Sequence, residues 1–149
     1  MIKTLSSALS LGILIAGCTG ARPMNLGVHD GKLAPCPASP NCVSSQSNDK
    51  DHAMEPIPFF GTSADTMADL KKVLSCMPRA RTVTATETYL HVEFTSALFR
   101  FVDDVEFWLD ESARTIHLRS ASRVGYSDLG VNRKRIEDLA AAMKALHPK

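Results

Sequence analysis

The stretch YLHVEF at residues 89–94 and the stretch FVDDVEFWL at residues 101–109 place apolar side chains at alternate positions. Successive side chains of a β-strand point to opposite faces of the sheet, so this period predicts two strands that share one apolar face. The apolar positions of the second strand are Phe99, Phe101, Val105, Phe107 and Leu109, with Asp103 among them. Residues 82–86 and 116–122 add two β-rich runs, and the short connections predict an antiparallel meander.

Two helical patterns flank the meander. Ser63 is the predicted N-cap of the first helix, and Pro78 is predicted to stop that helix because proline lacks the amide donor. The second helix is predicted to begin near Asn132. The apolar faces are formed by Met67, Leu70, Val73, Leu74 and Met77 in the first helix and by Ile136, Leu139, Ala140, Met143 and Leu146 in the second.

These elements predict an α+β fold in which an antiparallel sheet of about four to five strands is covered on one face by two helices. A short segment with Ile57, Phe59 and Phe60 is expected at a sheet edge, because prolines interrupt it. The arrangement resembles the helix-grip or TATA-binding-protein-like fold, a likeness that implies no function.

The charge composition argues against a nucleic-acid partner. The 149 residues include 17 Lys and Arg against 16 Asp and Glu, whereas a nucleic-acid surface needs clustered basic residues. The basic run at residues 133–135 is interpreted as a solvated helix face.

The N-terminus predicts export. Lys3 precedes an apolar stretch at residues 5–15 that is too short to span a bilayer, so it is typical of a signal peptide. Ile15-Ala16-Gly17-Cys18 resembles the lipobox of bacterial lipoproteins, and the resemblance implies cleavage before Cys18 and acylation of that residue. The alternative is an ordinary secretory leader with an accidental cysteine.

The chain is accordingly divided into three predicted parts. Residues 1–17 form the leader, residues 18–34 form a lipidated flexible tether rich in Gly, Pro and Asn, and residues 35–149 form one domain. The absence of Asp after Cys18 implies, by the same resemblance, the periplasmic face of the outer membrane. The lipid anchor makes the membrane the first expected partner.

Cys36 and Cys42 flank a proline-rich segment expected to be a rigid loop, and we interpret them as a disulfide, because the predicted compartment is oxidising. So short a closed loop would stabilise the fold by roughly 2–3 kcal/mol. Alternatively, Cys42 is a nucleophile with Cys36 as its resolving thiol. Cys76 is expected to be a small buried side chain, with pairing to Cys36 or Cys42 left open. No C-x-x-C pair occurs and the histidines are scattered, so no metal or cofactor is predicted.

An acidic trio lies in the second strand. Asp104 and Glu106 share one face, while Asp103 points to the apolar face, where a carboxylate is costly unless it is paired. Arg119 or Arg123 is its expected partner. The trio is interpreted either as ion pairs that set strand register or as an acid/base pair or cation site.

Residues 119–135 combine a strand end, a glycine-bounded turn and a helix start. The candidate ligand-binding residues are Arg119, Ser120, Ser122, Arg123, Tyr126, Asn132 and Arg133. Helix N-termini offer free amides, and arginines bind carboxylate or phosphate, so a small anion or a lipid headgroup is the predicted ligand. Alternatively, Asp128 and Asn132 cap the helix, and the arginines pair with Asp103, Asp104 or Glu106.

Three blocks of the chain resemble one family. They are CPASPNCVSS at residues 36–45, FVDDVEF at residues 101–107 and RSASRVGYSDLGVNRKR at residues 119–135. Together they resemble a bacterial and plastid family that is numbered 1499 among the domains of unknown function. The resemblance implies an extracytoplasmic or membrane-associated domain and supplies no activity.

Three functional hypotheses follow. The first is a non-enzymatic envelope lipoprotein domain that binds a small anionic ligand, a lipid headgroup or a protein partner between the Cys36–Cys42 loop and residues 119–133. The second is an envelope enzyme with Asp103, Asp104 or Glu106 as acid or base, or with Cys42 as nucleophile. The third is a structural or assembly factor of the envelope.

Overall fold

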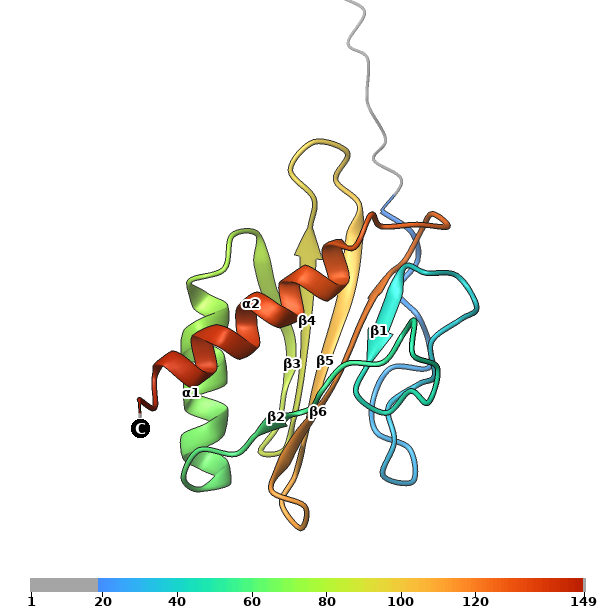
Figure 1. Ribbon diagram of the computed structural model, residues 1–149. Helices are drawn as coiled ribbons and strands as arrows, with labels where there is room; N and C mark the ends of the chain where they lie inside the picture. The colour runs from blue at the N-terminus through green and yellow to red at the C-terminus, as the bar shows by residue number, and fades with distance from the viewer. Residues whose placement is uncertain (1–18, 149) are drawn as a thin grey trace, which may run out of the picture.

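An antiparallel sheet forms the centre of the molecule (Figure 1). The computed structural model describes residues 19–148. The strands within them are β1 (Cys42–Ser44), β2 (Ile57–Pro58), β3 (Ala80–Ala85), β4 (Tyr89–Thr95), β5 (Val102–Asp110) and β6 (Thr115–Ser122). Their order is β1-β6-β5-β4-β3, and β2 also pairs with β6. The predicted meander of β3 to β6 is confirmed, because each of these strands pairs antiparallel with the next.

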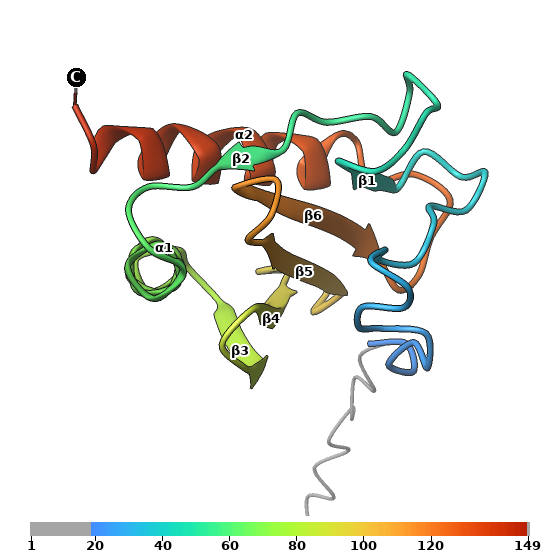
Figure 2. The ribbon, with the colours of Figure 1, turned by 90° about the horizontal axis from the view of Figure 1, so that it is seen from below.

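Two helices, α1 (Ser63–Ser75) and α2 (Val131–Ala145), lie on the same face of the sheet (Figure 2). The N-cap of α1 is Thr62, so the prediction of Ser63 is wrong by one residue. The Thr62 hydroxyl accepts from the Asp65 amide, and the Asp65 carboxylate accepts from the Thr62 amide. This reciprocal capping box requires a spacing of three residues, which selects Thr62.

The apolar face of the sheet packs against the helices and forms the core. Phe107 and Leu118 pair across β5 and β6, and both are buried together with Leu70 of α1 and Leu139 of α2. Burying one such side chain stabilises the fold by roughly 1.5–3 kcal/mol. The predicted α+β class, with two helices on one sheet face, is therefore confirmed.

The β4–β5 loop, residues 96–101, corrects the predicted strand. Phe99 and Phe101 lie in this loop with 64% and 41% of their surface exposed, and β5 begins only at Val102. The backbone at Arg100 has a φ of 59°, a left-handed conformation that no strand can continue. The prediction that both phenylalanines extend the apolar sheet face is wrong.

Two further expectations about the cysteine-bearing segments change. The proline- and cysteine-rich block is not loop throughout, because Cys42–Ser44 pairs with β6 as strand β1. Cys76 is exposed and is not in a disulfide, so its expected burial is wrong. It caps the C-terminus of α1 instead of standing on the apolar face of that helix.

Candidate functional site

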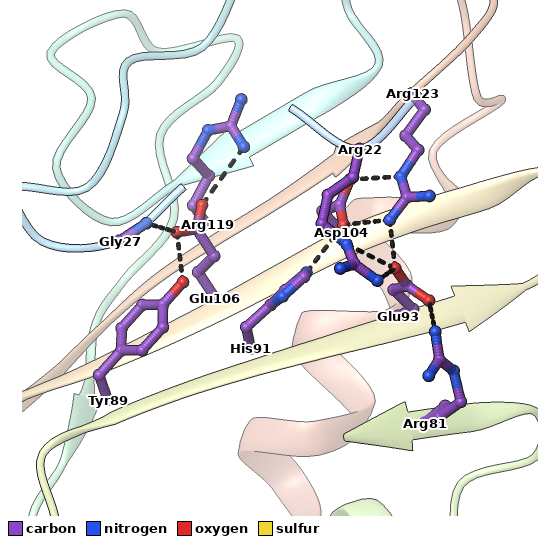
Figure 3. A network of polar contacts seen from close by, with 10 residues as sticks. All are labelled: Arg22, Gly27, Arg81, Tyr89, His91, Glu93, Asp104, Glu106, Arg119 and Arg123. Carbon is purple, nitrogen blue, oxygen red and sulfur yellow. Dashed lines mark hydrogen bonds and ion pairs between the residues drawn. The ribbon is translucent and has the colours of Figure 1, made fainter. Parts of the chain in front are cut away.

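The sheet face opposite the helices carries a buried network of ion pairs (Figure 3). Its carboxylates are Glu93 of β4 and Asp104 and Glu106 of β5, and all three are buried. Glu93 and Asp104 are direct neighbours across the two strands. Like charges in such positions repel one another and lose hydration, so this face is stable only with matching cations.

Arg123 is the central cation of the network. Its Nε and Nη2 atoms donate to the two oxygens of Asp104, each at 2.8 Å, and Nη2 also donates to Glu93. His91 Nε2 lies 2.8 Å from the same Asp104 carboxylate. Burial raises the pKa of Asp104, but the hydrogen bonds of Arg123 and His91 outweigh it, and the pKa lies below its ordinary value. The hydrogen bond to Asp104 in turn raises the pKa of Arg123, so this pair stays ionised.

Glu93 is contacted by three arginines. Arg22 donates to its carboxylate through Nε at 3.0 Å and through Nη2 at 2.6 Å. Arg81 of β3 and Arg123, the residue after β6, donate to the same carboxylate. Burial raises the pKa of Glu93, but the hydrogen bonds from Arg22, Arg123 and Arg81 outweigh it and lower the pKa to about 2. Glu93 is therefore an anion at any physiological pH.

Glu106 forms the second centre of the network. Its carboxylate accepts from the Gly27 amide at 2.7 Å and from the Tyr89 hydroxyl at 2.8 Å, and Arg119 Nη1 lies 3.5 Å away. Burial and the Glu106 charge raise the pKa of Tyr89, so the hydroxyl remains a proton donor. Arg119 is buried, and its Nε has no hydrogen-bond partner in the described part of the chain. The Glu106 charge is thus the main compensation for this guanidinium.

Residues 20–33 lie across this network and do not form the flexible tether predicted for residues 18–34. Arg22 and Gly27 bind the two carboxylates just described, from 71 and 79 residues away along the chain. Leu33 is buried, and its amide donates to Gln46 Oε1 at 2.8 Å. We call residues 20–33 the N-terminal clamp.

Gly20 begins the clamp with a close contact. A Cβ atom at this position would lie 2.9 Å from side-chain carbons of both Arg123 and Val124, and the Gly20 φ is 67°. Both the space and the left-handed backbone require glycine. The clamp therefore starts directly on the segment that follows β6.

Asp103 has a different partner from the expected arginines. It pairs with Arg135 of α2 at 2.6 Å, and the Arg135 guanidinium also lies 4.5 Å from the centre of the Phe94 ring. The prediction of Arg119 or Arg123 is wrong, because both of those side chains join the network on the opposite sheet face. Strand alternation separates Asp103 from them.

The predicted ligand-binding residues do not converge on one surface. Arg119 and Arg123 belong to the ion network, Tyr126 is exposed, and Arg133 donates to backbone oxygens of residues 51 and 53. The remaining three meet where α2 packs on β6, and there Asn132 of α2 hydrogen-bonds to both Ser120 and Ser122 of β6.

The N-terminus of α2 already has an anionic partner. The Asp128 carboxylate accepts from the Gly130 amide at 3.0 Å and from the Asn132 amide at 2.8 Å. These are the amides that an external anion would otherwise use. The structure thus agrees with the alternative in which Asp128 caps the helix. Asn132 does not cap it, because the Asn132 amide is one of the groups that Asp128 binds.

The predicted disulfide between Cys36 and Cys42 is present, with 5.6 Å between the Cα atoms. Cys42 is buried and its sulfur is bonded, so a nucleophilic role finds no free thiol here. A cleft of about 750 Å³ lies beside this loop, with Lys32, Gln46 and His52 among its lining residues. None of the ion network's three carboxylates lines this cleft.

His52 ties the disulfide loop to the next turn. Its Nδ1 lies 2.9 Å from an Asp49 carboxylate oxygen, and its Nε2 lies 3.1 Å from the Ser39 carbonyl oxygen. Only an imidazolium can donate to both acceptors. The hydrogen bond to the Ser39 carbonyl raises the pKa of His52, and the Asp49 carboxylate raises it further against the opposing effect of burial.

This arrangement predicts a pH-dependent contribution to stability. Because the folded pKa of His52 is raised, its contribution is complete below the unfolded value near 6.5 and is lost as the pH rises through the folded value. We expect His52→Gln to lower the free energy of unfolding more at acidic than at alkaline pH, as measured by urea denaturation. The control is His29→Gln, an exposed histidine of the same cleft. A loss that is constant with pH would contradict the expectation.

Some of the site could have been found from sequence. Tyr89, His91 and Glu93 alternate with the apolar residues of β4, so their shared face was visible, but no role was assigned to them. Arg22 and Gly27 carry no local signal, because their contacts depend on how the chain folds back.

Residues 19–148 contain no helix that is long and apolar enough to cross a membrane. Over the same range, no group of three or more His, Cys, Asp or Glu side chains is arranged to hold a metal ion.

The fold and the site define a small α+β domain with one apolar sheet face under two helices and one ion-paired face under an N-terminal clamp. The chain belongs to the family described as "Protein of unknown function (DUF1499)", whose model matches residues 32–143. A search of curated proteins finds no match. The matched range includes the sheet carboxylates and Arg123, whereas Arg22 and Gly27 precede it.

Proposed function

We propose that this chain is a cell-envelope lipoprotein whose domain is held directly on a lipid surface, at the periplasmic face of the outer membrane. The lipobox-like Ile15-Ala16-Gly17-Cys18 supports the anchor, although Cys18 lies outside the described residues. Two or more acyl chains on such a residue give stable membrane attachment where one chain does not.

The observation that carries the proposal is the packing of Gly20 on Arg123 and Val124. Gly20 is the second residue after Cys18, and an extended chain spans at most roughly 3.6 Å per residue. The backbone of Gly20, which packs on the residues that follow β6, would therefore lie within about 7 Å of the backbone of an acylated Cys18. The domain would sit on the membrane instead of at the end of a tether.

The site supports binding more than catalysis. Asp104 and Glu106 are buried with basic partners, Asp103 pairs with Arg135, and Cys42 is in a disulfide. Arg119 and Arg123 already face carboxylates, so they are poor candidates for an external anion. The ion network is better explained as the set of contacts that holds the N-terminal clamp on the sheet. The position of Gly20 next to Arg123 and Val124 favours a lipid surface as the partner.

The anchor is tested by mass spectrometry of the native protein after labelling of cells with a palmitate analogue. We expect a mature N-terminal peptide that begins at Cys18 and carries a diacylglyceryl group and an amide-linked acyl chain. Cys18→Ser is expected to abolish the label and to retain the leader. A bare Cys18 thiol, or unprocessed wild-type protein in the cytosol, would overturn the proposal.

A further inference from the structure

Large apolar side chains are exposed mainly at one end of the sheet. The described chain exposes seven of them, and six belong to this end. They are Leu98, Phe99 and Phe101 of the β4–β5 loop, Tyr126 and Leu129 of the β6–α2 connection, and Val131 at the start of α2. The seventh, Met24, lies within the N-terminal clamp. Apolar residues gathered in this way mark an interaction surface.

The two segments lie side by side, and we call their six exposed apolar residues the apolar end. The Arg123 amide at the start of the β6–α2 connection donates to the carbonyl of Val102, the first residue of β5 after the β4–β5 loop, at 3.1 Å. A groove of about 420 Å³ is lined by Ala97 from the loop and by Val131 and Lys134 from α2. Both segments stand at the upper end of the molecule in Figure 1, near the first described residues.

The backbone holds these side chains outward. Arg100 and Leu129 both adopt left-handed conformations, with φ of 59° and 56°, which cost about 1–2 kcal/mol each in residues other than glycine. In the β4–β5 loop, Ser96 donates to the Phe101 carbonyl at 2.8 Å, and the Ser96 hydroxyl accepts from the Phe101 amide at 2.9 Å. Strained turns that fix apolar side chains in solvent point to a function for the exposed surface.

We infer that the apolar end inserts into the headgroup layer of an anionic bilayer as a second membrane contact beside the acyl chains. The inference rests on the proposed lipid anchor, because Gly20 contacts Val124 at the start of the β6–α2 connection, two residues after Cys18. Aromatic and aliphatic side chains of this kind bury roughly 5–10 Å deep at a membrane interface.

The charges around the apolar end fit an anionic lipid surface. Arg100 stands between Phe99 and Phe101 at the loop tip, and Arg79 lines the adjoining groove, where Lys134 is paired with Asp138. The Asp128 carboxylate in the β6–α2 connection is occupied with capping α2. Basic residues beside inserted apolar side chains strengthen binding to anionic headgroups.

The test measures membrane depth with single tryptophan reporters in the mature lipoprotein. Trp108 is the one tryptophan of the chain, so in a Trp108→Phe background each introduced tryptophan is the single tryptophan of its protein. Leu98→Trp and Tyr126→Trp place reporters in the two segments, at positions 80% and 75% exposed, where the fold tolerates a larger side chain. Ala113→Trp, in the turn after β5 at the opposite end of the sheet, is the matched control. Each protein is reconstituted in phosphatidylethanolamine and phosphatidylglycerol vesicles that contain brominated acyl chains.

We expect bromine to quench the Leu98→Trp and Tyr126→Trp reporters at least about twofold more than the Ala113→Trp reporter, with a blue shift of their emission. Equal quenching at both ends, or none at the apolar end, would overturn the inference. The two reporters could also remain exposed to water in vesicles and yet be shielded from iodide quenching in native envelope fragments. That result would assign the apolar end to a protein partner and would overturn the inference. A bare Cys18 in the mass spectrum would overturn the anchor and this inference together, whereas absent quenching in a protein shown by mass spectrometry to be acylated would overturn this inference alone.

Discussion

Replacing Arg123 with alanine is expected to lower the free energy of unfolding by about 3–5 kcal/mol, because it leaves buried carboxylates without their shared cation. Asp104 would keep only His91, and Glu93 would keep Arg22 and Arg81. Urea denaturation at neutral pH measures the loss. Arg81→Ala is the matched control, since its side chain also binds Glu93 but is 67% exposed, and it should cost less than about 1 kcal/mol.

The same variant has a defined pH dependence. Asp104 and Glu93 have folded pKa values below their ordinary values of 3.8 and 4.5, with that of Glu93 at about 2. Their contribution is therefore complete above the unfolded pKa and disappears as the pH falls through the folded pKa. The difference between wild type and Arg123→Ala should shrink as the pH falls below about 4. Equal losses for Arg123→Ala and Arg81→Ala would contradict a role for the buried pair.

Replacing Glu106 with alanine is expected to cost about 3–5 kcal/mol and to release the N-terminal clamp from the sheet. The variant removes the acceptor of the Gly27 amide and the Tyr89 hydroxyl, and it leaves the Arg119 guanidinium buried without a counter-charge. Hydrogen exchange followed by mass spectrometry should show faster exchange over residues 20–33. Denaturation measures the global loss.

Two controls separate the contributions of Glu106. Tyr89→Phe removes one hydrogen bond and should cost roughly 1 kcal/mol without releasing the clamp. Glu106→Gln keeps an acceptor oxygen but not the charge, so its effect should fall between those of the other two variants. Unchanged exchange over residues 20–33 in Glu106→Ala would show that the clamp is held by other contacts.

The clamp connects stability to the proposed function. In the intact protein, ion pairs and backbone hydrogen bonds would transmit the position of an acylated Cys18 to the sheet. A released clamp would turn the same residues into a true tether of about 15 residues, with an average reach of roughly 20 Å. The apolar end would then lose its fixed position relative to the membrane.

The sequence by itself determined the elements whose side chains follow a local period. The alternation in residues 89–94 and 101–109 predicted β4 and β5, and the spacing in residues 63–77 predicted α1. The pairing of Cys36 with Cys42 was also accessible, because the two cysteines flank a short loop and the N-terminus predicted an oxidising compartment. In each case the deciding interactions lie within a few residues along the chain.

Only the tertiary structure decided which charges meet and which apolar residues stay exposed. Alternation placed Asp103 and Asp104 on opposite faces, but Arg135 became the partner of Asp103 because α2 crosses that end of the sheet. Arg22 reaches Glu93 across 71 residues, a contact that no local pattern records. Phe99 and Phe101 match the period of β5, yet the turn at Arg100 takes them out of the sheet. A periodic pattern reports which side of an element is apolar, whereas ion pairing and exposure depend on what the rest of the chain brings against it.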